Sequence, residues 1–197
     1  MVYTQTYHIG DLVTNEDGSQ GLVFYVNPDG SGGWMVALTD ASTDCIWGNN
    51  SDIPGLTFQT AQVQLLSDDL NGYANTQAIR LVGSQNVFPA AWLVDFENGW
   101  YLPSAGQLIH LNAVLGLLDD RFVLYGGQTM DGRYWSSSLY DETKVWCLDA
   151  GIFESSNQGA AFHENRISPR YNYGVRAVHD FSCLTSNSWL RRTVLGG

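Results

Sequence analysis

Apolar and polar positions in the N-terminal third alternate with turn signals in a way that predicts short strands. Runs at 9–13, 21–26 and 33–38 are rich in Val, Leu, Phe, Tyr and Trp, which favour strands. The intervening Asp17-Gly18 and Asp29-Gly30 pairs supply the positive φ that tight hairpin turns require. Neither pair is followed by spaced oxygen ligands and a terminal Glu, so turns are expected and not calcium loops. We therefore expect a hairpin region within residues 1–60.

The middle of the chain has a helical period. Residues 71–82 fit a short amphipathic helix and residues 88–94 fit a second one. The clearest helix begins after Ser104, which forms an S-x-x-Q capping box with Gln107. An apolar stripe follows at spacings of three and four, made of Leu108, Leu111, Leu115 and Leu118. His110 has no partner histidine one turn away, so we expect it to be structural or solvent-facing and not a metal ligand.

Strand patterns return in the C-terminal half. Segments at 133–138, 144–150 and 175–181 are rich in aromatic or β-branched residues, whereas residues 151–174 are polar and show no clear period. A chain of 197 residues with 44% hydrophobic content can bury one sizeable core. We therefore expect one domain over residues 1–197, of the α+β class, with short antiparallel strands and two or three helices.

The charge balance narrows the set of partners. The net charge is −11, and the 9 basic residues are scattered apart from the pair Arg191-Arg192. Nucleic-acid binding needs clustered Lys and Arg to neutralise phosphates, so we expect neither nucleic acid nor an anionic membrane surface as a partner. No apolar run reaches the roughly eighteen residues of a membrane-spanning helix, and Met1–Gly10 lacks the apolar stretch of a signal peptide.

Cysteine and serine positions give no sign of catalysis or metal binding. Cys45, Cys147 and Cys183 lack metal-ligand spacing. One disulfide with a free thiol is compatible with the sequence, and three buried free thiols is the simpler interpretation. The triplet at 136–138 lacks the Gly-x-Ser-x-Gly setting of a nucleophile, so we expect its hydroxyls to satisfy backbone groups at a strand end. No metal site and no cofactor is expected.

Four motifs occur in an order that resembles a known family. They are GWYLPSAGQL at 99–108, YWSSS at 134–138, Trp146, and VRAV at 175–178. The set is similar to the pattern of bacterial and phage domains related to the C-type lectin and formylglycine-generating-enzyme fold, with Gln107 where that pattern has Glu. The resemblance covers roughly residues 9–181 and implies a C-type-lectin-like fold. In that fold Trp100, Trp135 and Trp146 belong to the core.

The resemblance also implies a function in binding. The family includes variable proteins of diversity-generating retroelements, whose hypervariable stretch lies between the YWSSS and VRAV motifs and meets the ligand; here that stretch is 139–173. Mutation of Asn codons in such systems does not yield Glu, Gln, Lys or Trp, so residues of these types are assigned to the scaffold. The candidate ligand contacts are Leu139, Tyr140, Asp141, Phe162, His163, Ile167, Arg170, Tyr171 and Tyr173. Tyr is favoured in such surfaces because it combines contact area with hydrogen bonding.

Other interpretations remain open. The variable stretch of retroelement proteins tends to end the chain, whereas a tail at 179–197 follows it here. An ordinary bacterial surface, fimbrial or tail-fibre adhesin domain without diversification is therefore the alternative. A copper-dependent formylglycine-generating oxidase would need a reactive pair such as Cys147 and Cys183, but the surrounding sequence does not match that enzyme's motif. The Glu-Pro-Asn and Trp-Asn-Asp strings of calcium-dependent lectins are absent.

These observations lead to one expected function. We expect a non-catalytic module that binds a protein or glycan ligand on a cell surface, located outside the cell, on a bacterial surface or on a phage virion. Membrane insertion is not expected. A homo-oligomer is compatible with the resemblance.

Overall fold

The architecture is α+β, with few helices and mainly antiparallel strands. The computed structural model describes residues 3–4, 6–60, 66–150, 161–166 and 172–185. The strands are β1 (Tyr3–Thr4), β2 (Leu12–Thr14), β3 (Gln20–Val26), β4 (Gly32–Ala37), β5 (Ser42–Cys45), β6 (Arg133–Leu139), β7 (Lys144–Asp149), β8 (Ala161–Asn165), β9 (Tyr173–Val175), β10 (Val178–Ser182) and β11 (Leu184–Thr185). The helices are α2 (Gly72–Val82), α3 (Pro89–Trp92), the 3-10 helix η1 (Phe96–Asn98) and α4 (Ala105–Leu124).

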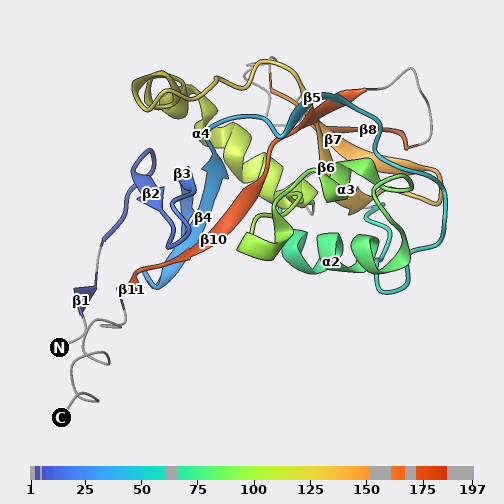
Figure 1. Cartoon of the computed structure of the whole chain (residues 1–197), viewed down its shortest axis with the longest axis horizontal. Helices are drawn as coiled ribbons and strands as arrows, with labels where there is room; N and C mark the ends of the chain where they lie inside the picture. The colour runs from blue at the N-terminus through green and yellow to red at the C-terminus, as the bar shows by residue number, and fades with distance from the viewer. Residues whose placement is uncertain (1–2, 5, 61–65, 151–160, 167–171, 186–197) are drawn as a thin grey trace, which may run out of the picture.

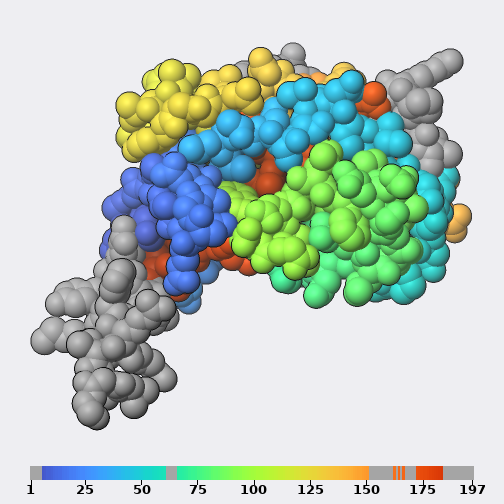
Figure 2. Space-filling model, in the orientation of Figure 1, coloured from blue at the N-terminus to red at the C-terminus, as the bar shows by residue number. Residues whose placement is uncertain are grey.

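Two larger sheets and one small pair organise the described strands. One sheet has the order β10-β4-β3-β2, the other has the order β5-β9-β6-β7-β8, and β1 pairs with β11. All pairings are antiparallel except that of β6 with β9. Helix α4 packs against strands of both larger sheets, while α2 and α3 lie at one end of the molecule (Figure 1). Figure 2 shows the hairpins of β2–β4 (blue) and the α2–α3 region (green) at opposite sides, with part of β10 (red) visible between them.

Helix α4 forms where the sequence predicts it. Its four stripe leucines are buried against Leu22, Val36 and Val178 of the four-stranded sheet. Phe122 extends the stripe by one more turn and is fully buried. Burying side chains of this size stabilises the fold by about 2 kcal/mol each. A second core cluster, which includes Trp47 and Trp135, lies under α2 and α3.

A capping box begins α4. The Ser104 hydroxyl accepts a hydrogen bond from the Gln107 backbone N–H at 3.3 Å, and the Gln107 side-chain oxygen accepts from the Ser104 backbone N–H at 3.0 Å. Both residues are fully buried. The capping box predicted from the sequence is confirmed, although Gln replaces the usual Glu.

The remaining N–H groups of the first helical turn find partners in distant segments. The Ala105 N–H donates to the Ser138 hydroxyl of β6 at 2.8 Å, and the Gly106 N–H donates to the Asp69 carbonyl at 3.1 Å. A Cβ at Gly106 would lie 2.4 Å from that carbonyl oxygen, so only glycine permits this approach. The start of α4 is therefore hydrogen-bonded both to β6 and to the segment before α2.

The YWSSS serines are buried in this region. The Ser136 hydroxyl donates to the Trp146 carbonyl at 2.8 Å, and the Ser138 hydroxyl donates to the Asp69 carboxylate. These two contacts confirm a structural role for the hydroxyls, although Ser138 bonds a side chain as well as a backbone N–H. The Ser137 hydroxyl has no partner among the described atoms.

Some strand predictions need correction. The segment 175–181 is not one strand: it divides into β9 and β10, which belong to different sheets. The chain changes sheets at Arg176, whose guanidinium is buried and held by several oxygens. Strands β5 and β8 were not expected, because 42–45 is polar and 161–165 lies in the segment without clear period.

Other expectations hold or fall outside the described part. Trp100, Trp135 and Trp146 are at most 5% exposed, which confirms their place in the core. Gly18 and Gly30 have φ angles of +87° and +70°, as the hairpin turns require. Residues 151–160 and the tail from 186 to 197 lie outside the described residues. Within the described residues, no helix is both long and apolar enough to cross a membrane.

The capping box yields a stability prediction. Ser104→Ala removes both the cap of α4 and a hydroxyl that donates to the Asp69 carbonyl, so we expect the free energy of unfolding to fall by about 2 kcal/mol. Urea denaturation followed by circular dichroism measures this change. The control Ser84→Ala, at an exposed serine, should stay within about 0.5 kcal/mol of the wild type. Equal effects of the two substitutions would contradict the role of the cap.

Candidate ligand-binding site

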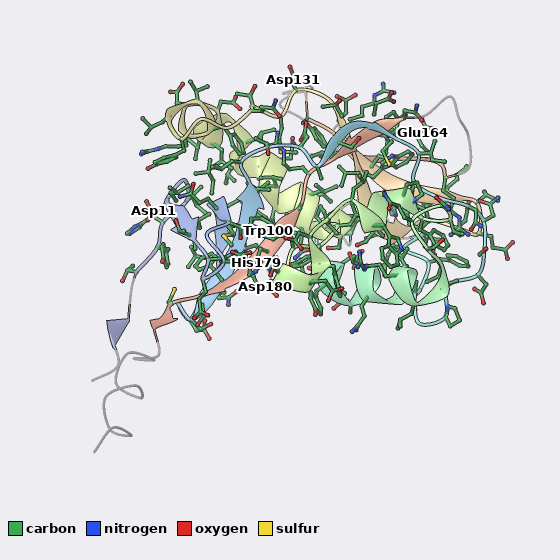
Figure 3. The ribbon with its side chains drawn as sticks, viewed as in Figure 1. Asp11, Trp100, Asp131, Glu164, His179 and Asp180 are labelled. Carbon is green, nitrogen blue, oxygen red and sulfur yellow. The ribbon has the colours of Figure 1, made fainter. Side chains whose placement is uncertain are left out.

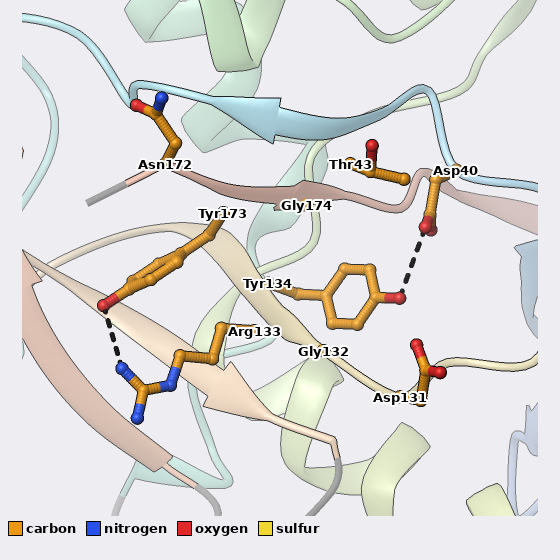
Figure 4. Close-up of a pocket in the computed structure, with 9 residues that line it drawn as sticks. All are labelled: Asp40, Thr43, Asp131, Gly132, Arg133, Tyr134, Asn172, Tyr173 and Gly174. Carbon is orange, nitrogen blue, oxygen red and sulfur yellow. Dashed lines mark hydrogen bonds between the residues drawn. The ribbon is translucent and has the colours of Figure 1, made fainter. Parts of the chain in front are cut away.

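A pocket with several polar lining residues opens where β5, β6 and β9 lie side by side. It has a volume of about 350 Å³, within the usual range of small-molecule sites. Its lining residues are Asp40, Thr43, Asp131, Gly132, Arg133, Tyr134, Asn172, Tyr173 and Gly174 (Figure 4). Strand pairing brings these residues together from three distant parts of the chain, since β9 lies between β5 and β6.

Arg133 forms one wall of the pocket at the start of β6. Its Nε donates to the Asp149 carboxylate at 3.0 Å, and its Nη1 lies 3.4 Å from the Tyr173 hydroxyl (Figure 4). Its guanidinium carbon also lies 5.1 Å from the centre of the Phe162 ring. The hydrogen bonds to Tyr173 and Asp149 raise the pKa of Arg133. The side chain is thus held in place, yet 51% of it remains exposed to solvent.

Asp40 and Tyr134 form the opposite side of the pocket. The Tyr134 hydroxyl donates to the Asp40 carboxylate at 3.3 Å (Figure 4), and the same carboxylate pairs with Arg176. Burial raises the pKa of Asp40, and the Arg176 charge beside it opposes that rise. A Cβ at Gly174 would lie 2.7 Å from the Tyr134 ring, so glycine lets β9 pass close to this wall.

Arg176 supports the pocket from beneath. Its side chain is fully buried and donates to the carbonyls of Ala37 and Gln128, each at 3.0 Å, in addition to Asp40. The guanidinium carbon lies 5.2 Å from the centre of the Phe122 ring. Breaking a buried pair of this kind is strongly destabilising, because the remaining charge loses its partner. The arginine of the VRAV motif is therefore part of the scaffold.

The expected contacts divide into two groups that the structure does not bring together. Phe162 and Tyr173 adjoin the pocket: Phe162 is half-buried, and its ring centre lies 5.8 Å from that of Tyr173. Tyr140 and Asp141 follow the far end of β6. Since a strand of seven residues spans about 23 Å, one small ligand cannot contact both groups.

The burial of two expected contacts requires correction. Leu139 is 3% exposed and packs in the core with Trp135 and Val145, so its assignment as a surface contact is wrong. Tyr173 is 7% exposed; its ring belongs to the same core, and its hydroxyl is bonded to Arg133 at the pocket. Every residue of β6 after Arg133 and every residue of β9 is buried, so both faces of the sheet are covered at these positions.

The other expected contacts have different positions. The half-buried Tyr140 ring packs edge-on against Trp146, and the Asp141 carboxylate accepts from the Thr143 N–H at 2.7 Å within the β6–β7 turn. His163 lies in β8 opposite Trp146 in the strand register. Ile167, Arg170 and Tyr171 lie outside the described residues.

The sequence did not point to most of the pocket. Asp40, Thr43, Asp131, Arg133 and Asn172 were not among the expected contacts. Two of them could have been found from the sequence, because Asp131 and Arg133 flank a glycine directly before the YWSSS motif. The contribution of β5 depends on its pairing with β9, which no local pattern reveals.

The three cysteines are buried and unpaired with one another. This confirms the expectation of three buried free thiols. Burial raises the pKa of Cys45 to about 11 and that of Cys147 well above its usual range, which disfavours the thiolate forms. In the described part of the chain, no group of three or more His, Cys, Asp or Glu side chains is placed to hold a metal ion.

Comparison with solved structures identifies a distant likeness. The fold is similar to that of a fimbrial protein from Bacteroides ovatus, with a TM-score of 0.57 and 17% sequence identity over 89% of this chain. The chain spans about half (49%) of the length of that protein. At this identity the likeness concerns the fold alone. No protein-family model matches the sequence, and comparison with curated proteins gives no match.

The buried phenols predict a loss of stability at alkaline pH. Burial, together with the neighbouring Asp40 carboxylate, raises the pKa of Tyr134 to about 12. The unfolded state therefore releases this proton first, and stability is lost as pH rises from about 10 towards 12. At pH 11 the loss due to Tyr134 alone is about 1.4 kcal/mol. Urea denaturation at pH 8 and pH 11 measures it.

Tyr134→Phe is the control for this prediction. It removes the titrating group, so the difference between the two pH values should shrink by about 1.4 kcal/mol. Burial and the Asp180 carboxylate also raise the pKa of Tyr101, so part of the alkaline loss should remain in the variant. An unchanged difference would show that Tyr134 is not the responsible group.

Proposed function

We propose that this chain is a non-catalytic ligand-binding domain of a bacterial surface protein, of the kind found in fimbrial adhesins. The observation that carries the proposal is the pocket between β5, β6 and β9, where a positioned but exposed Arg133 faces several polar groups. The likeness to the fimbrial protein from Bacteroides ovatus supports the surface role. The raised pKa values of Cys45 and Cys147 support the absence of thiol catalysis.

A neutral glycan is the ligand class that suits this pocket. The Arg133 guanidinium and Thr43 hydroxyl offer donors, the Asp131 carboxylate offers acceptors, and the Asn172 amide offers both. Sugar hydroxyls donate and accept in the same way. Asp149 already balances the Arg133 charge, so an anionic ligand gains less here than at an unpaired arginine. The proposal requires no calcium ion.

The C-type-lectin-like fold belongs to the same proposal. The motifs on which the resemblance rests have connected structural roles: Ser104 begins α4, Ser138 fastens it to β6, and Arg176 marks the change of sheets. These roles support a common architecture with that family.

Diversification of the segment 139–173 is a second candidate. The position of Phe162 and Tyr173 at the pocket favours diversification. The burial of Leu139 disfavours it, because a buried residue cannot contact a ligand. A neighbouring reverse-transcriptase gene with an adenine-rich imperfect repeat of these codons would support it. If the locus has neither, the adhesin domain without diversification is the remaining interpretation.

Glycan binding tests the main proposal. Arg133→Ala and Asn172→Ala should each reduce binding to glycans on an array at least about tenfold, because each removes hydrogen bonds to ligand. The free energy of unfolding should change by about 1 kcal/mol at most, because half of the Arg133 side chain is exposed to solvent. Isothermal titration with the glycan selected on the array gives the affinities.

An exposed arginine away from the pocket provides the matched control. Arg121→Ala, on α4, should leave glycan binding unchanged. The proposal fails if the wild-type protein binds no glycan, or if Arg133→Ala and Arg121→Ala bind equally well.

A further inference from the structure

A row of side chains crosses the four-stranded sheet on the face that α4 covers. Tyr25 of β3 and Asp180 of β10 both lie opposite Trp34 of β4 in the strand register. Such neighbours project to the same face, about 5 Å apart. The Tyr25 and Trp34 rings stack with centroids 4.3 Å apart, and the His110 ring of α4 lies 5.1 Å from that of Tyr25. We refer to these four residues as the Trp34 row.

The Trp34 row is partly open to solvent. Its three rings are half-buried, and Asp180 is exposed. Within the described residues, the indole N–H of Trp34 has no hydrogen-bond partner, whereas the other five described tryptophans each donate theirs to an oxygen. Aromatic side chains with an apolar face and an unused donor are enriched at binding surfaces.

Asp180 is oriented but not neutralised. One of its oxygens accepts a hydrogen bond from the Tyr101 hydroxyl at 2.9 Å, and that hydroxyl accepts from the Gln107 side chain at 2.8 Å. Since Gln107 supplies the hydrogen on that side, the Tyr101 proton is directed to Asp180. No Lys or Arg of the described residues forms an ion pair with Asp180. The carboxylate therefore presents an unpaired negative charge beside the Trp34 ring.

We propose that the Trp34 row binds a cationic side chain, Lys or Arg, of a partner protein. Its charged group is attracted by the electron-rich ring face and by the Asp180 carboxylate together. The net charge of −11 favours the approach of a basic partner. A sugar can also stack on Trp34, but a carboxylate that no described Lys or Arg pairs with favours a cation.

This surface is separate from the glycan pocket. Asp131 at the pocket and Asp180 in the Trp34 row lie well apart in Figure 3, and the two sites belong to different sheets. Glycan binding and binding of a basic partner can therefore fail independently. The Arg133→Ala variant should keep full binding to a basic peptide.

A basic peptide tests the inference directly. Titration of the ¹⁵N-labelled full chain with an Arg/Lys-rich dodecapeptide at low salt should shift the Trp34 indole N–H resonance in a saturable way. Asp180→Asn retains an acceptor for Tyr101 but removes the charge, and should weaken binding about five- to tenfold. Trp34→Leu should weaken it similarly; circular dichroism checks that each variant is folded.

Control variants distinguish specific binding at the Trp34 row from non-specific electrostatic attraction between the acidic protein and the basic peptide. Asp44→Asn removes one exposed charge on β5 and should bind the peptide like the wild type. Equal weakening by Asp44→Asn and Asp180→Asn would overturn the proposal, because it would show non-specific attraction. A Trp34 response to methyl glucoside without one to the peptide would also overturn it.

Discussion

The fold depends on the buried start of α4. The first N–H groups of a helix lack partners within the helix, and burying them without hydrogen bonds would be costly. Here the capping box of Ser104 and Gln107 satisfies two of them, and Ser138 and the Asp69 carbonyl satisfy two more. Because these partners come from β6 and from the segment before α2, satisfying the helix start also fixes three parts of the chain relative to one another.

Arg176 makes a comparable connection between the two larger sheets. The chain leaves β9 at this residue and enters β10 two residues later. Its buried guanidinium contacts Asp40, Ala37 and Gln128, so it joins both sheets to the segment after α4. Asp40 in turn reaches Tyr134 at the wall of the pocket. The shape of the candidate site thus depends on a charge that is buried behind its wall.

Local patterns predicted the helices well and the sheets only in part. Periodicity and the Ser104 cap located α2 and α4, because helix hydrogen bonds are local in sequence. The division of 175–181 into two strands could not be predicted, since it depends on what surrounds Arg176. The pocket was missed for the same reason: Thr43 and Asn172 approach Arg133 only through strand pairing. The resemblance pointed to Phe162 and Tyr173, which lie at the candidate pocket, but could not tell the buried Leu139 from an exposed residue.

The position of β4 has a consequence for how the protein is made. β4 lies between β3, its neighbour in sequence, and β10, which follows it only after a long stretch of chain. During synthesis the hairpin of β3 and β4 is made first, and the edge of β4 stays unpaired until the segment from Leu38 to Ala177 has been made. An unpaired edge of this kind invites pairing with other chains, and late long-range contacts slow folding. Nascent chains of this protein are therefore expected to need protection by chaperones until β10 is released from the ribosome.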